Sequence, residues 1–407
     1  MSIKGSNLSI VKKKNSQLIR EILYDNSPIS RTEIAQRIAL SLPTVTTNIA
    51  KLIADGAVLE LSSPQEGDSK QLGRRPVMLD YSPDYRYYIG VDLSPYWTYL
   101  VITDLRGRIL FQKRNDLIST QYSSMLNTLQ NVIFENLREA NLEKERILGV
   151  GICLPGFIDA DQGIVHNNMR KDWNGHRLAA DLEQLVGIPV HIENNVRARA
   201  IGFGLFHKNQ SESPLLYYFI SHGVGCSLVL DREVLYGASA GAGEIGHMVV
   251  DPNGPVCATC GNRGCLEAVA SESAIVRQCK SIMNSGIPTI IKAICPDPEN
   301  LLITDVLTAQ SCKDSVAANV VNEAVRHIGL NIANLANFIS PQSIVVDSNL
   351  FTYEENQSAV MEIIRNNTFS YQNKRMDITF LPHNSYSGAI GAAATAVKTF
   401  FLENTDD

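Results

Sequence analysis

The feature that most constrains this chain is a cluster of metal-ligand residue types between positions 244 and 267. The cluster contains one histidine and three cysteines: His247, Cys257, Cys260 and Cys265. A neutral imidazole and three thiolates form a complete tetrahedral ligand set for Zn²⁺. Because four protein ligands leave no open position, we predict one structural zinc ion per chain. The alternative is three buried free thiols beside a core histidine.

Length and composition are those of a globular protein. The 407 residues allow two or three domains, and 44% of them are hydrophobic and 19% charged. No apolar run approaches the ~20 residues that span a bilayer, and the basic N-terminus lacks the apolar core of a secretory signal. Five of the eight cysteines are scattered outside the cluster, which indicates a reducing compartment. We therefore predict a cytoplasmic protein without membrane insertion.

Residues 1–80 are predicted to form a winged helix-turn-helix domain. Helical periodicity covers 15–24, a capping box at Ser30 and Glu33 opens a helix over 31–38, and a third helix runs from Ser41 to Ile53. Strands are expected at 57–61 and 77–79, on either side of a polar loop. This segment has 11 basic and 8 acidic residues, whereas the remainder has 25 and 34. A basic front end on an acidic body suits a nucleic-acid module.

The third helix would read DNA through its exposed face. Thr and Asn side chains bond base edges or phosphates, and Lys binds phosphate. Two arginines in Gly73-Arg-Arg-Pro76 would enter the narrow minor groove. The predicted DNA-binding residues are Thr44, Thr46, Thr47, Asn48, Lys51, Arg74 and Arg75. The alternative is a head that only packs or dimerises.

The remaining chain alternates predicted strands and helices, which is typical of an α/β protein. Strands are expected at 87–92, 97–103, 108–113, 147–154, 188–192, 215–220, 227–230 and 344–346. Helices are expected at 122–143, from 195 onward, at 317–339 and, rich in Gly and Ala, at 387–400.

The sequence resembles the ROK family of repressors, uncharacterised reading frames and sugar kinases. The resemblance rests on Glu244-x-Gly-His247 followed by Cys260-Gly-x-x-Gly-Cys-Leu-Glu267. It implies an actin-like ATPase (ribonuclease H-like) body in two lobes, at 81–195 and 196–407, the second with the zinc knuckle and a dimerisation surface. The family usually has one residue between the first two cysteines, whereas Cys257 and Cys260 are separated by two.

The same resemblance implies a sugar site between the lobes. The residues that it assigns to sugar hydroxyls are Asn168, Asn194, Asn195, Glu244, His247 and Glu267. The alternative is a relic pocket whose carboxylates only support the zinc site.

Kinase members of the family carry phosphate and base motifs that this chain lacks. Where they have Asp-x-Gly-Gly-Thr, this chain has Asp92-Leu-Ser-Pro-Tyr96, and Pro95 has no amide donor. The catalytic Asp position is Asn195, whose neutral amide cannot act as a base. The later glycine motifs read Gly223-Val-Gly225 and Asp347-Ser-Asn349. We therefore predict that the protein is not an enzyme.

These observations predict a sugar-responsive transcriptional regulator, most simply a repressor of carbohydrate-use genes. Its partners would be operator DNA and a small sugar or sugar phosphate. A homodimer or homotetramer is expected, because one helix-turn-helix reads only a half-site. Two alternatives remain: control by a protein partner such as a sugar-transport subunit, and a sugar kinase with an added DNA-binding head.

Overall fold

The computed structural model describes residues 8–61, 76–116, 119–168, 170–207, 214–238, 240–369 and 376–404. The chain forms two compact units, one of residues 1–208 with 386–407 and the other of residues 209–385. The first unit extends past the predicted lobe boundary at residue 195 to residue 208, and it also includes the last segment of the chain. Among the described residues, no helix is both long and apolar enough to cross a membrane.

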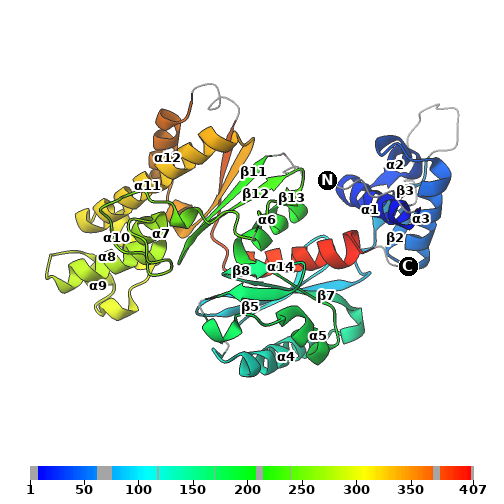
Figure 1. Cartoon of the computed structure of the whole chain (residues 1–407), viewed down its shortest axis with the longest axis horizontal. Helices are drawn as coiled ribbons and strands as arrows, with labels where there is room; N and C mark the ends of the chain where they lie inside the picture. Colours follow the sequence, from blue (N-terminus) through cyan, green and yellow to red (C-terminus); the bar gives the residue numbers. More distant parts are fainter. Residues whose placement is uncertain are drawn as a thin grey trace. The chain divides into compact units, whose positions relative to one another are not determined.

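The N-terminal head is a three-helix domain with a small sheet (Figure 1). Its elements are α1 (Leu8–Asn26), β1 (Ile29–Ser30), α2 (Arg31–Arg37), α3 (Leu42–Ala54), β2 (Val58–Leu61) and β3 (Met78–Tyr81). The sheet has the order β1-β3-β2, with both pairings antiparallel. The three predicted helices and two strands are confirmed, although α1 starts seven residues earlier than expected, and β1 was not predicted.

Local capping fixes where α2 and α3 begin. The Ser30 hydroxyl accepts a hydrogen bond from the Glu33 amide, and the Glu33 carboxylate accepts one from the Ser30 amide, which forms the predicted capping box. The Ser41 hydroxyl accepts a hydrogen bond from the Thr44 amide and so caps α3, without a capping box. Val45, Ile49 and Leu52 of α3 are buried at helical spacing, which leaves the opposite face of this helix toward solvent.

The first lobe is a five-stranded sheet with helices on both faces. Its strands have the order β10-β7-β4-β5-β6. The parallel part pairs β10 (Val190–Asn194), β7 (Ile147–Leu154) and β4 (Tyr87–Leu93), and the antiparallel part adds β5 (Thr98–Thr103) and β6 (Ile109–Asn115). Helices α4 (Tyr122–Glu139) and α5 (Leu178–Val186) cover one face, and α6 (Asn195–Phe206) and α14 (Ser387–Val397) lie on the other (Figure 1). A hairpin of β8 (Phe157–Asp159) and β9 (Ile164–Asn167) follows β7.

The C-terminal helix lies directly on the strands because both partners have small residues there. A methyl group built on Gly90 of β4 would lie 1.9 Å from the Ala389 carbonyl oxygen, and one on Gly151 of β7 would lie 1.8 Å from that of Ala392. Only glycine allows such close backbone approach. The predicted C-terminal helix is therefore part of the first unit, and it continues as a π-helical turn, η6 (Lys398–Leu402).

The second unit contains a sheet of the same topology. Its order is β13-β12-β11-β14-β15, with β11 parallel to β14 and β14 parallel to β15, and with β11–β12 and β12–β13 antiparallel. The strands are β11 (Leu215–Ile220), β12 (Val224–Leu230), β13 (Glu233–Val234), β14 (Ser343–Asp347) and β15 (Asp377–Leu381). A three-stranded meander followed by two parallel strands thus occurs in both units, which confirms the predicted ribonuclease H-like architecture.

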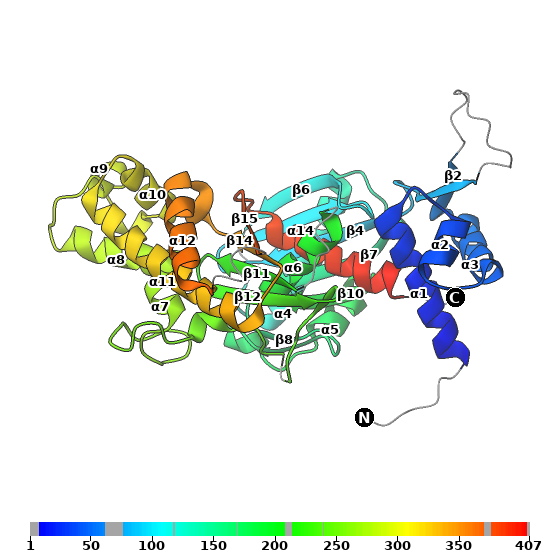
Figure 2. The same cartoon turned by 90° about the horizontal axis from the view of Figure 1, so that it is seen from above.

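Helices gather beside this second sheet (Figure 2). They are α7 (Leu266–Ala270), α8 (Glu272–Asn284), α9 (Ile291–Ile294), α10 (Ile303–Ser311), α11 (Ser315–Ile339) and α12 (Glu354–Asn367). Of these, only α11 was predicted. The long helix α11 and the strands β11 and β14 share one buried core with α7, α8, α10 and α12.

Candidate metal centre and effector residues

The structure brings the four predicted metal ligands together. One ligand atom each of His247, Cys257, Cys260 and Cys265 lies within 4.8 Å of the other three. The Cys260 and Cys265 sulfurs are 3.5 Å apart, and the Cys257 sulfur lies 3.7 Å from Nδ1 of His247. A tetrahedral ion with metal–sulfur bonds of about 2.3 Å holds its sulfurs roughly 3.8 Å apart. The donor set and its spacing therefore fit a zinc ion.

Two close backbone approaches shape the segment from His247 to Glu267, called the knuckle here. His247 ends η3 (Ile245–His247), and Cys265 directly precedes α7. A β-bridge between Val249 and Cys265 joins these two parts of the chain. A side chain on Gly264 would collide with the Asp251 carbonyl oxygen at 1.6 Å, and Gly264 has a φ of +73°. The glycine before the last cysteine is thus required by backbone packing.

Two of the predicted sugar-binding residues lie at this centre, since His247 is one of its four candidate ligands. Oε1 of Glu267 lies 3.8 Å from the Cys257 sulfur. Oε1 also accepts a hydrogen bond of 2.6 Å from the Thr259 hydroxyl. Glu244, the third predicted contact of this unit, is exposed and directly precedes η3. The structure therefore places Glu267 beside the candidate ligands, and Glu244 lies three residues before His247 along the chain.

Two of the other three predicted sugar contacts, Asn168 and Asn194, bind the Pro155–Gly156 turn of the first unit. Asn168 Nδ2 donates to the Pro155 carbonyl at 2.5 Å, and Asn194 Nδ2 donates to the Gly156 carbonyl at 3.0 Å. Asn194 is also the N-cap of α6, since its Oδ1 accepts hydrogen bonds from two amides of the first turn. Asn195 is the first residue of that helix and is half-buried. These contacts give Asn168 and Asn194 a structural role besides any ligand contact.

The predicted DNA-reading residues form one face of α3. Thr46, Thr47 and Lys51 are exposed, and Thr44 and Asn48 are half-buried. Asn48 Nδ2 donates to the Thr44 carbonyl at 2.9 Å, and the Thr47 hydroxyl donates to the Pro43 carbonyl at 3.0 Å. Arg74 and Arg75, predicted for the wing, lie outside the described residues.

Comparisons with known proteins decide the family. The ROK family model matches residues 88–399, and a winged helix-turn-helix DNA-binding model matches residues 14–58. The chain belongs to the ROK family. The xylose repressor of Bacillus subtilis is 29% identical over 342 residues, which cover 84% of each chain.

Solved structures agree with this assignment. A ROK family transcriptional regulator, a homologue of the Escherichia coli Mlc protein, superposes with a TM-score of 0.82 at 24% identity, covering 96% of this chain and 98% of that one. A ROK hexokinase from Thermus thermophilus has a TM-score of 0.61 at 25% identity, covering 76% of this chain and 97% of the hexokinase. The ROK fold is thus shared by repressors and kinases, and the residues of the site must distinguish them.

Asp92, the position where the resemblance to ROK kinases expects their phosphate motif to begin, is paired with a buried arginine. Oδ2 of Asp92, at the end of β4, lies 2.9 Å from the Arg199 guanidinium, and both side chains are buried. The same guanidinium donates to the Ser387 hydroxyl at 3.2 Å and to the Asn195 carbonyl at 2.9 Å. A methyl group on Gly388 would lie 1.9 Å from Asp92 Oδ2. The ion pair and α14 therefore surround the Asp92 carboxylate closely.

Sequence reasoning missed Arg199 and its neighbour Arg197. Arg197 Nε lies 2.7 Å from Oε1 of Glu193, which is fully buried. Two arginines among the small and apolar residues of 195–206 were the available signal, because buried guanidinium groups occur almost only with carboxylate partners.

A second buried carboxylate binds the loop where ROK kinases carry paired glycines. Glu272 begins α8, and its carboxylate accepts hydrogen bonds from the Asn349 amide at 2.9 Å, Asn349 Nδ2 at 3.2 Å and the Ser348 hydroxyl at 3.1 Å. Burial raises the pKa of Glu272 from its ordinary value of 4.5 to about 7, against the lowering effect of these hydrogen bonds. The loop after β14 is thus held by hydrogen bonds to a carboxylate of the same unit.

The raised pKa predicts a pH-dependent stability that Glu272→Gln removes. Between pH 4.5 and about 7 the native state holds a proton that the unfolded chain has released. The contribution of Glu272 to the free energy of unfolding is therefore greatest below 4.5, and it falls by up to about 1.4 kcal/mol per pH unit until pH passes the native pKa. Urea unfolding of both proteins between about pH 5 and pH 8 measures this.

The matched control is Glu362→Gln, an exposed glutamate of the same unit. The difference in free energy of unfolding between wild type and Glu272→Gln should narrow or reverse in sign as pH rises. The corresponding difference between wild type and the control variant should change less with pH. Parallel curves for wild type and Glu272→Gln would contradict the raised pKa.

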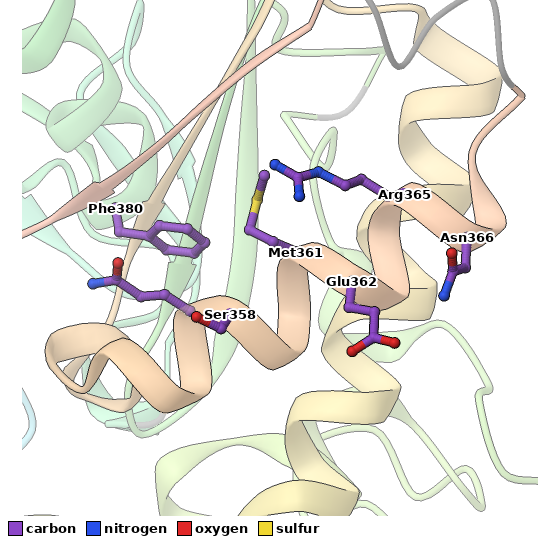
Figure 3. Close-up of a pocket in the computed structure, with 7 residues that line it drawn as sticks. Ser358, Met361, Glu362, Arg365, Asn366 and Phe380 are labelled. Carbon is purple, nitrogen blue, oxygen red and sulfur yellow. The ribbon is translucent and has the colours of Figure 1, made fainter.

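A surface pocket of about 360 Å³ lies elsewhere in the second unit (Figure 3). Helix α12 supplies Met361 and Arg365, and β15 supplies Phe380. None of the predicted sugar-binding residues lines this pocket. It is therefore separate from the knuckle carboxylates.

Proposed function

We propose that this ROK protein is a sugar-responsive transcriptional regulator, most simply a repressor of carbohydrate-use genes. It would bind operator DNA through Thr44, Thr46, Thr47, Asn48 and Lys51. A homodimer or homotetramer would supply two heads, because each head reads one half-site. The similarity to a xylose repressor supports this proposal. A protein that binds operator DNA would act in the cytoplasm, with its DNA.

The effector would be a sugar or sugar phosphate. In the second unit, the carboxylates of Glu244 and Glu267 would accept hydrogen bonds from its hydroxyls, with His247 beside them. In the first unit, the proposed contacts are Asn168, Asn194 and Asn195. A structural zinc ion on His247 and the three cysteines would hold the knuckle in shape and supply no chemistry, because its coordination would be complete.

The observation that carries the proposal is a buried core that the DNA-binding head shares with the ROK lobe. Ile19, Leu23 and Tyr81 of the head pack in one cluster with Tyr88 of the lobe and Phe401 of η6. The Tyr81 and Phe401 rings meet edge to face at 5.2 Å, and Arg20 donates to the Phe401 carbonyl at 2.6 Å. The head is thus fixed to the lobe, so that a movement of the lobe would move the head.

Arg106, in the turn between β5 and β6, strengthens this junction from the lobe side. Its guanidinium stacks 4.4 Å from the Tyr24 ring centre and lies 3.1 Å from the Asp80 carboxylate. It also donates to the Tyr24 carbonyl and the Ser27 hydroxyl. The Tyr24 hydroxyl in turn donates to the Leu105 carbonyl at 3.0 Å.

Phe401→Leu is expected to loosen the head. It removes the ring contact with Tyr81, and such aromatic pairs contribute about 0.5–1.5 kcal/mol beyond their buried area. Thermal unfolding should show a loss of native stability of at least this size. The affinity of the protein for operator DNA should depend less on the effector. Phe338→Leu is the matched control, since Phe338 is 89% exposed and its replacement should change stability by less than about 0.5 kcal/mol. Equal effects of the two substitutions would refute the proposed junction.

We further propose that the protein transfers no phosphoryl group. Asp92 is paired with Arg199, Asn195 cannot accept the sugar hydroxyl proton, and Asn349 is bound by Glu272. ATP-dependent phosphorylation of a hexose or N-acetylhexosamine, abolished by Glu244→Ala, would instead show a ROK kinase with a DNA-binding head.

The decisive experiment combines a sugar panel with operator binding. Thermal unfolding is measured with xylose, glucose, N-acetylglucosamine, N-acetylmannosamine and the 6-phosphates of the hexoses. A sugar at 100 times its dissociation constant adds about 2.7 kcal/mol to native stability. The sugar that binds should change the mobility shift of the chain's own upstream DNA, and Lys51→Ala should weaken that shift more than Lys292→Ala does. No stabilising sugar, despite salt-sensitive operator binding, would favour control by a protein partner.

A further inference from the structure

We propose that Thr259 is a positioning residue for the Glu267 carboxylate, and that it holds this carboxylate in the orientation that accepts a hydrogen bond from an effector hydroxyl. This inference rests on the proposed function, in which Glu267 binds the sugar. It identifies a residue of this chain that helps to set effector affinity, within the two-residue spacer between Cys257 and Cys260.

The first support is the hydrogen bond itself. Thr259 Oγ1 donates to Glu267 Oε1 at 2.6 Å, although Thr259 is exposed to solvent. Hydrogen bonds from hydroxyls to carboxylates are short and about twice as strong as neutral ones. Because Thr259 directly precedes Cys260, and Cys257 lies two residues earlier, the proposed zinc ligands on both sides fix its backbone. Thr259 can therefore orient a carboxylate that would otherwise rotate.

The second support is the close approach of the other oxygen to the backbone. A methyl group built on Gly223, in the turn between β11 and β12, would lie 2.6 Å from Glu267 Oε2 and 3.5 Å from the carboxyl carbon. Oε2 therefore packs against the backbone of this turn, and a larger residue at 223 would push the carboxylate aside. Glycine at 223 thus helps to hold the carboxylate in the orientation that Thr259 supports.

These two observations show that the carboxylate is held from both sides. Oε1 accepts from Thr259 and lies 3.8 Å from the Cys257 sulfur. Oε2 lies against Gly223. Preorganising an acceptor before the ligand arrives increases affinity, because less conformational freedom is lost on binding. The chemistry that the carboxylate would recognise is a hydroxyl donor, as on a pyranose.

The contact is tested first without sugar. Thr259→Val keeps the shape of the side chain and removes its hydroxyl, and Glu267→Met removes the acceptor. In a double-mutant cycle followed by thermal unfolding, the two substitutions should be non-additive, because both remove the same hydrogen bond. Additive effects would overturn the contact. Wild type and Thr259→Val should contain equal amounts of zinc, because the Thr259 hydroxyl is not a proposed metal ligand. Loss of zinc in Thr259→Val would refute a purely positioning role.

The positioning role is tested by titration with xylose, glucose and N-acetylglucosamine. The dissociation constant of the sugar that binds wild type should rise about 10-fold in Thr259→Val, a change of about 1.4 kcal/mol. Thr259→Ser, which keeps the hydroxyl, should restore it, and Thr308→Val, an exposed threonine on α10, should leave it unchanged. Equal affinities of wild type and Thr259→Val would overturn this inference alone. Failure of wild type to bind any of the three would count against the proposed function, and the positioning role would fail with it.

Discussion

Cys265→Ser is expected to abolish binding of the proposed zinc ion and to destabilise the second unit. Cys265 is fully buried where the knuckle meets α7, so its loss breaks the ligand set and frees the chain that carries Glu267. Structural zinc contributes about 10–16 kcal/mol in zinc-finger peptides, and about 1 kcal/mol shifts the midpoint by 2–4 °C in a unit of this size. We expect the midpoint of thermal unfolding to fall by at least about 10 °C, even if only a fraction of that contribution is lost.

The measurement is elemental analysis for zinc together with thermal unfolding, with and without chelator. Cys312→Ser is the matched control, because Cys312 is an exposed cysteine of the same unit outside the cluster. It should keep both its zinc and its midpoint. Wild type without zinc, or a Cys265→Ser protein with unchanged zinc and sugar response, would show that the cysteines are only buried thiols.

Arg199→Met is expected to lower the free energy of unfolding by about 3–5 kcal/mol, because it leaves the Asp92 carboxylate buried without its partner. Asp92 is 2% exposed, so water cannot replace the guanidinium. The loss should appear in urea unfolding of the first unit. The substitution also removes the hydrogen bond to Ser387, which connects α6 to the start of α14.

Two comparisons separate this effect from simple loss of an arginine. Arg326→Met breaks an exposed pair with Glu323 and should change stability by less than about 1 kcal/mol. The double variant Asp92→Leu with Arg199→Met should recover much of the lost stability, because no unpaired charge remains. If Arg199→Met were as mild as Arg326→Met, the buried ion pair would not be a stabilising feature of the lobe.

Much of this protein could be predicted from local sequence. The helix-turn-helix follows from helical periodicity and from the caps Ser30 and Ser41, which act within three residues. Buried strands such as β4 and β7 follow from continuous apolar runs. The four candidate metal ligands lie within 19 residues of one another, so two short cysteine spacings and one histidine were enough to predict that they meet.

The short helices of the second unit were not predicted, because they are brief and their stability comes from packing. Helices α7, α9 and α10 have 5, 4 and 9 residues, too short for helical periodicity to be decisive. The predicted limits of the lobes differed from the compact units for a similar reason. Nothing local in residues 387–400 indicates that they pack on β4 and β7, because that contact depends on glycines more than 230 positions away.

The sequence by itself determined the family, the head and the ligand types, because each is encoded in residues close together along the chain. Only the tertiary structure decided how the polar groups are paired. Asp92 meets Arg199 across 107 positions, Glu272 meets Asn349 across 77, and Phe401 reaches the head from the far end of the chain. Even the Thr259–Glu267 contact, only eight residues apart, depends on the fold of the knuckle. A buried charge or hydroxyl takes whichever partner packing brings within hydrogen-bond distance, and sequence spacing does not reveal that partner.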